Sequence, residues 1–85
     1  MQADSVRPAI RAYILDNYLF TDDPAALDDA ASFQEHRIID SMGMMQVIHF
    51  IEREFQFKVR DEDMVPEKLD SVDRLVAFIA GRKGR

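Results

Sequence analysis

The segment Ser41–Phe55 reads SMGMMQVIHFIEREF, and its apolar residues recur at intervals of three and four positions. At about 100° per residue, this spacing predicts a helix with one apolar stripe packed on a core. The stripe consists of Met44, Val47, Ile48, Ile51 and Phe55. The opposite face carries Met42, Gln46, His49 and Arg53, with Met45 at its edge near Ser41. This second face is half apolar near Ser41, unlike the charged surface of an ordinary solvated helix.

Two further segments have a helical period. The first, Asp4–Tyr18, has an apolar residue every fourth position, and Asp4 or Ser5 can cap its first turn. The last follows Asp70-Ser71, has Val72, Leu75, Val76 and Ile79 as its buried stripe, and is expected to stop at Gly81. A short helical turn is predicted at PEKL, residues 66–69, with its proline in the first turn.

A long connection, residues 19–39, joins the first two helices and contains four aspartates and a proline. Leu27, Phe33, Ile38 and Ile39 are spaced along it and can anchor it to a core, so we predict an ordered loop. A loop of this length in a small domain is usually functional. The sequence therefore predicts an all-α, four-helix bundle with three main helices, one short helix and a long first loop. Residues 1–85 form one domain, with a core of about 4–81 and a flexible tail at 82–85.

Composition narrows the class of protein. A chain of 85 residues has room for one core and no deep enclosed pocket. It has no cysteine, which excludes disulfides and thiolate metal sites, and its net charge of −5 argues against nucleic-acid binding. No apolar run is long enough to cross a membrane, and the N-terminus does not resemble a secretion signal. We expect a cytoplasmic monomer.

The sequence offers no convergent catalytic or metal-binding set. His36 and His49 fall on different elements, and His49 is about two helical turns from Ser41, too far to act as its general base. The acidic run of Asp22, Asp23, Asp28 and Asp29 lacks the spacing of a calcium loop and is interpreted as a solvated face, as is DEDMVPE at 61–67. We expect a non-catalytic protein without a metal.

Three Asp-Ser pairs precede helical segments: Asp4-Ser5, Asp40-Ser41 and Asp70-Ser71. The dipeptide alone predicts only a helix cap. The middle pair differs in its surroundings, because a long anchored loop precedes it and two outward-facing methionines, Met42 and Met45, follow it. Adaptable thioethers at such a position suit a partner surface.

Residues 32–79 resemble acyl carrier proteins and the related peptidyl carrier domains. The shared features are Phe33 ahead of the loop end, Asp-Ser-Met at a helix start, IEREF at its end, a V-x-D-E-D turn, PEKL and a capped final helix. The resemblance implies that Ser41 carries 4'-phosphopantetheine, with Asp40 as the adjacent motif acid. The chain would then hold acyl or aminoacyl groups as thioesters. Its expected partners are a phosphopantetheinyl transferase, an acyl- or aminoacyl-adenylating ligase and downstream biosynthetic enzymes, which would dock on Met42, Met45, Gln46, His49 and Arg53.

The chain departs from fatty-acid-type carriers on both sides of Ser41. Arg37, Ile38 and Ile39 replace the usual glycine before Asp-Ser, and Gly43 and Gln46 stand where acidic docking residues are common. These departures favour a carrier of a specialised, secondary-metabolic or lipid pathway. A conventional fatty-acid carrier is the alternative within the family. A helical protein-interaction module that is never modified is the alternative from another class.

Overall fold

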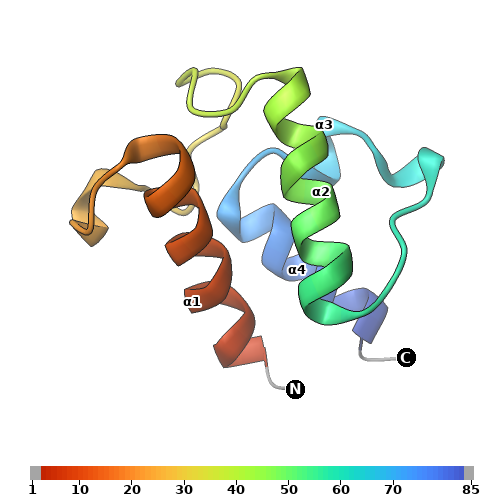
Figure 1. Cartoon of the computed structure of the whole chain (residues 1–85). Coiled ribbons are helices and arrows are strands. Elements are labelled where there is room, and N and C mark those ends of the chain that lie inside the picture. The colour runs from red at the N-terminus through yellow and green to blue at the C-terminus, as the bar shows by residue number, and fades with distance from the viewer. Residues whose placement is uncertain (1–2, 84–85) are drawn as a thin grey trace.

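The protein is described by a computed structural model of residues 3–83, with side chains for residues 6–82. Within that range it contains α1 (Ala3–Ile14), α2 (Ser41–Phe55), α3 (Pro66–Leu69) and α4 (Val72–Lys83), and no strand. Figure 1 shows α1 and α2 on either side of α4, with the first loop arching over one end of the bundle. Helix α4 packs against both α1 and α3. The predicted all-α bundle of three main helices and one short helix is confirmed.

The helix bounds agree with the periodic patterns except at two ends. Helices α2 and α3 have the predicted limits. The first helix is α-helical only to Ile14 and continues as a wider π-helical turn over Leu15–Leu19. Helix α1 begins at Ala3, so Asp4 and Ser5 lie inside it rather than before its first turn, contrary to the caps predicted there. At the start of α4, Ser71 is the cap, since its Oγ accepts a hydrogen bond from Arg74 N at 3.1 Å.

Gly81 does not end the last helix, contrary to the sequence-based expectation. Helix α4 runs to Lys83, and the side chain of Arg82, the first residue of the predicted tail, is half-buried. The Arg82 guanidinium donates to Asp63 Oδ2 at 3.0 Å and lies over the rings of Phe57 and Phe78, 5.6 and 5.8 Å from their centroids. These contacts hold the last turn of α4 in place. The rest of the predicted tail, residues 84–85, lies outside the described residues.

The core is built from the apolar stripes of the helices and from the long loop. Its buried members are Val6, Ile10, Ile14, Leu15, Leu27, Phe33, Ile39, Val47, Ile48, Ile51, Phe55, Val59, Leu69, Val72, Leu75, Val76 and Ile79. Phe33 has no exposed surface, and its N–H donates to Asp70 O at 2.8 Å. Of the four predicted anchors, Leu27, Phe33 and Ile39 are buried and Ile38 is half-buried against the core, so the prediction of an ordered loop is confirmed.

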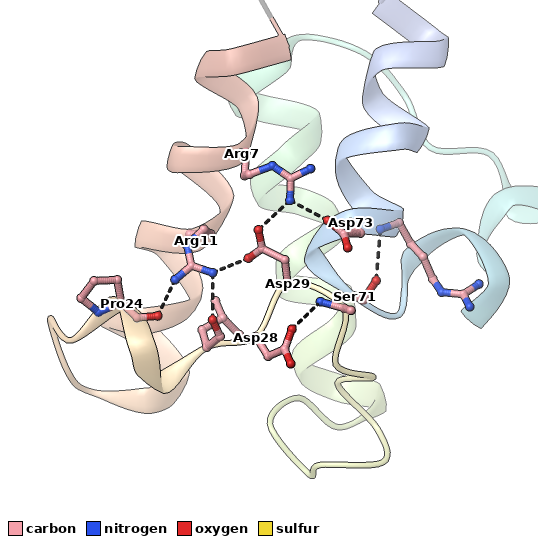
Figure 2. A network of polar contacts seen from close by, with 10 residues as sticks. Arg7, Arg11, Pro24, Asp28, Asp29, Ser71 and Asp73 are labelled. Carbon is pink, nitrogen blue, oxygen red and sulfur yellow. Dashed lines mark hydrogen bonds and ion pairs between the residues drawn. The ribbon is translucent and has the colours of Figure 1, made fainter.

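The acidic residues of the loop are not a purely solvated face. Asp29 accepts hydrogen bonds from Arg7 Nη1 at 2.6 Å and from Arg11, both on α1, and Arg7 also pairs with Asp73 on α4. Arg11 donates further to the carbonyls of Leu27 and Pro24, at 2.9 and 2.6 Å. Figure 2 shows this network joining α1, the loop and α4. The interpretation of the acidic run as simple surface charge was wrong for Asp29.

The second acidic stretch also contains a buried member. Asp63 is 7% exposed and accepts from Lys68 Nζ at 2.7 Å and from Arg82. The hydrogen bond from Lys68 is the main cause that holds the pKa of the Asp63 carboxyl below its usual value. Among the described residues, no group of three or more His, Asp or Glu side chains is arranged to hold a metal ion. No helix in residues 3–83 is long and apolar enough to cross a membrane.

Candidate functional site

Ser41 is the first residue of α2, directly after the capping residue Asp40. The Asp40 carboxylate accepts from Gly43 N at 2.7 Å, and its backbone carbonyl accepts from Met44 N at 2.8 Å. The Ser41 side chain is exposed. The N–H groups of Ser41 and Met42 donate no hydrogen bond to any described residue. An exposed hydroxyl thus lies beside two unpaired amides at the positive end of the helix dipole, where an anion is stabilised.

Ser41 lies between two hollows in the surface. The first has a volume of about 190 Å³ and runs between α2 and α3. Its lining residues are Gln34, Ser41, Met44, Met45, Ile48, Met64, Val65, Pro66, Leu69 and Asp70. The second, of about 330 Å³, lies on the loop side of the serine and is lined by Gln34, Arg37, Ile39, Asp40 and Ser41. The α3 side is lined mainly by apolar side chains, whereas four of the five residues that line the loop side have polar or charged side chains.

The predicted outer face of α2 is exposed in the structure. Met42 is 80% exposed and Met45 43%, and the side chains of Gln46, His49 and Arg53 are also exposed. Met44, expected to fill the core, is only half-buried and lines the groove towards α3. The structure adds Met64, 37% exposed, on the far side of that groove. Met64 was missed because no periodic pattern connects it with α2.

Gly43 does not belong to the exposed outer face of α2, although it stands where fatty-acid-type carriers commonly have an acidic docking residue. It is buried against the π-helical turn, where the Tyr18 hydroxyl lies 3.0 Å from both Gly43 O and Gln46 Oε1. A β-carbon at position 43 would lie 3.1 Å from Tyr18 Cε1 and 3.1 Å from Ile39 Cγ2. The absent side chain thus lets Tyr18 approach the first turn of α2. A glycine inside a strongly periodic helix was the available signal for this contact.

Tyr18 is expected to ionise late in an alkaline titration. Burial is the main cause that raises the pKa of its phenol from 10.0 to about 12. Since the folded-state pKa is raised, its contribution to stability is complete below pH 10 and is lost as the pH rises towards 12. Ultraviolet absorbance of the wild type should contain a phenolate step near pH 12 that Tyr18→Phe lacks. A wild-type titration that is complete near pH 10 would contradict the burial of the Tyr18 hydroxyl.

Comparison with known proteins identifies the family. Residues 19–79 match the family model described as "Phosphopantetheine attachment site". The mitochondrial acyl carrier protein 2 of Arabidopsis thaliana is 34% identical over 58 residues, which cover 68% of this chain and 44% of that protein. The chain therefore spans less than half the length of this curated relative.

The fold has a counterpart among solved structures. The solution NMR structure of a holo acyl carrier protein from Nitrosomonas europaea matches over 100% of both chains, with a TM-score of 0.71 and 22% sequence identity. The likeness of that structure concerns the bundle alone, whereas the match over residues 19–79 concerns the sequence around Ser41. The chain belongs to the acyl carrier protein family of phosphopantetheine attachment domains, whose cofactor is covalently bound 4'-phosphopantetheine.

Proposed function

We propose that Ser41 carries the 4'-phosphopantetheine and that the chain is a non-catalytic carrier. It holds acyl or aminoacyl groups as thioesters and presents them to partner enzymes. The observation that carries this proposal is the exposed Ser41 hydroxyl at the start of α2, inside the segment that matches the family. The bound group supplies a thiol on a long flexible arm, and tethering raises the local concentration of the cargo at each partner.

The residues around Ser41 fit a phosphate. The unpaired amides of Ser41 and Met42 and the helix dipole favour negative charge at this end of α2. Ser71, the serine of the Asp-Ser pair before α4, is only 2% exposed and is itself the cap of that helix, so a transferase could not reach it. The apolar groove between α2 and α3 offers shelter to the apolar part of a bound chain next to its attachment point.

The partner enzymes are expected to dock on the outer face of α2. A standard interface of about 800 Å² per partner has a radius of roughly 16 Å, which equals about ten residues of helix. A footprint centred on Ser41 therefore includes Met42, Met45, Gln46 and His49, and it has Arg53 at its rim. Among the residues of α2, the acid nearest to Ser41 is Glu52, which is half-buried and accepts a hydrogen bond from Val59 N at 2.9 Å.

This face suits a partner that offers apolar contacts rather than a basic strip. Interfaces are depleted in charge at their centre and enriched in methionine. We therefore propose a specialised pathway, in which an acyl- or aminoacyl-adenylating ligase loads the carrier. The likeness to the Arabidopsis acyl carrier protein supports the alternative of conventional fatty-acid synthesis. The absence of cysteine suits the reducing cytoplasm that we propose as its location.

Met42→Glu is expected to distinguish a partner with an apolar docking surface from a partner with a basic one. Met42 is 80% exposed, so the free energy of unfolding should change by less than about 0.5 kcal/mol. A charge in the centre of an apolar interface should lower kcat/KM for loading by the ligase by about 5- to 30-fold, corresponding to 1–2 kcal/mol. Ala77→Glu, exposed on α4, is the matched control and should load normally. An increase in kcat/KM for Met42→Glu would instead indicate a basic partner surface of the fatty-acid type.

The carrier assignment is tested by counting thiols. The chain has no cysteine, so any thiol that appears after incubation with coenzyme A and a broad-specificity phosphopantetheinyl transferase belongs to the attached group. We expect reaction with a maleimide dye to rise from zero to one label per chain. A chain that stays unlabelled with every transferase tried would favour the unmodified interaction module.

A further inference from the structure

Arg37 lies on the loop side of Ser41, and the sequence alone assigns it no role. Together with Ser41 and Asp40 it lines the 330 Å³ hollow. Its backbone is held in a left-handed conformation, with φ of 55°, and its N–H donates to Gln34 O at 3.2 Å. Among the described residues that line the two hollows beside Ser41, Arg37 is the one with a positive charge.

The Arg37 guanidinium has no partner within the described part of the chain. The other arginines with described side chains are paired, with the exception of Arg53. Arg7 and Arg11 share Asp29, and Arg82 pairs with Asp63. The Arg37 side chain is exposed and makes no ion pair or hydrogen bond with a described residue. This cation is therefore available to a group that arrives at Ser41.

A phosphodiester on Ser41 would bring two negative charges close together at the start of α2. The attached group adds one negative charge next to the Asp40 carboxylate, whose Oδ1 is already engaged by Gly43 N. The dipole of α2 contributes about half a positive charge at its N-terminus, which offsets only part of the two negative charges. A guanidinium in the same hollow can supply the remainder, and its planar set of donors matches phosphate oxygens.

We propose that Arg37 is a positioning residue for the phosphate of the 4'-phosphopantetheine, held by a charge-assisted hydrogen bond on the loop side of Ser41. This proposal rests on the assignment of Ser41 as the attachment residue. With the phosphate held by Arg37 and by the amides of α2, the arm leaves the serine towards the apolar groove on the opposite side.

The test compares Arg37→Gln and Arg37→Lys with Arg53→Gln, in which the other unpaired arginine is changed. Each variant is prepared as apo and holo protein, with loading verified by intact mass. The first readout is the ³¹P resonance of the phosphodiester, which does not depend on enzyme activity. We expect this resonance to move in Arg37→Gln, to move less in Arg37→Lys, and to coincide with the wild type in Arg53→Gln.

The second readout is a thermodynamic cycle between substitution and modification. We expect Arg37→Gln to lower the folded-to-unfolded ratio about 2- to 5-fold more in the holo than in the apo protein at low salt. The difference should shrink at 1 M salt, where charges are screened beyond about 3 Å.

Two results would overturn the proposal. One is a holo Arg37→Gln protein whose ³¹P resonance coincides with the wild type and whose cycle shows no coupling, even if loading becomes slower, because Arg37 would then contact the transferase only. The other is a chain that no transferase modifies, which would remove the carrier assignment together with this one.

Discussion

Phe33→Ala is expected to lower the free energy of unfolding by about 3–5 kcal/mol, because it removes the largest fully buried side chain. Small domains have only about 5–15 kcal/mol of stability in total. Phe33 also holds the loop that leads to the site, since its carbonyl accepts from Ile38 N at 2.8 Å and its N–H donates to Asp70 O. The cavity would therefore loosen both the core and the segment that ends at Asp40.

Urea denaturation measures this loss, and Phe20→Ala is the matched control. Phe20 belongs to the same loop and is 81% exposed, so its removal should change the free energy of unfolding by less than about 0.5 kcal/mol. Equal effects for the two substitutions would mean that Phe33 is not packed in the core and that the loop is not anchored as described.

Arg11→Met is expected to cost about 2 kcal/mol, in the range of hydrogen bonds to charged groups. The guanidinium donates to two loop carbonyls and to Asp29, and its side chain is only 19% exposed. Methionine keeps the apolar stem but leaves those acceptors without this donor. The first loop should therefore be less firmly held to α1, as the network in Figure 2 indicates.

Arg7→Met is the control for Arg11→Met, with the same substitution one turn earlier on α1. Arg7 is 40% exposed and bonds only to carboxylates, and Asp73 is 50% exposed, so the expected loss is about 0–1 kcal/mol. Thermal or urea unfolding of both variants measures the two losses in the free energy of unfolding. A loss for Arg7→Met as large as that for Arg11→Met would show that the ion pairs, rather than the loop carbonyls, provide the stability.

The features that depend on local periodicity were predictable from the sequence. The bounds of α2, the PEKL turn and the stripe of α4 all follow from spacing and capping residues that act within a few positions. The loop anchors Leu27, Phe33 and Ile39 were also predictable, because large apolar residues within a polar segment are stabilised by burial in a core.

The features that depend on tertiary contacts were missed. Tyr18 lies in the π-helical turn over Leu15–Leu19, and its contact with Gly43 joins positions 25 residues apart, which no local pattern indicates. Arg82 remains in α4 beyond Gly81 because it contacts Asp63, Phe57 and Phe78, which lie earlier in the chain. The exposed face of α2 was located correctly, yet the role of Gly43 at its buried edge required the fold.

The most direct test of the carrier assignment is the intact mass of the protein after coexpression with a phosphopantetheinyl transferase. The wild type and Ser71→Ala, which alters the buried serine of the corresponding Asp-Ser pair, should each gain the mass of one phosphopantetheinyl group. Ser41→Ala should keep its unmodified mass. An adduct that persists in Ser41→Ala would contradict the attachment site, and a wild type without any adduct would contradict the carrier function itself.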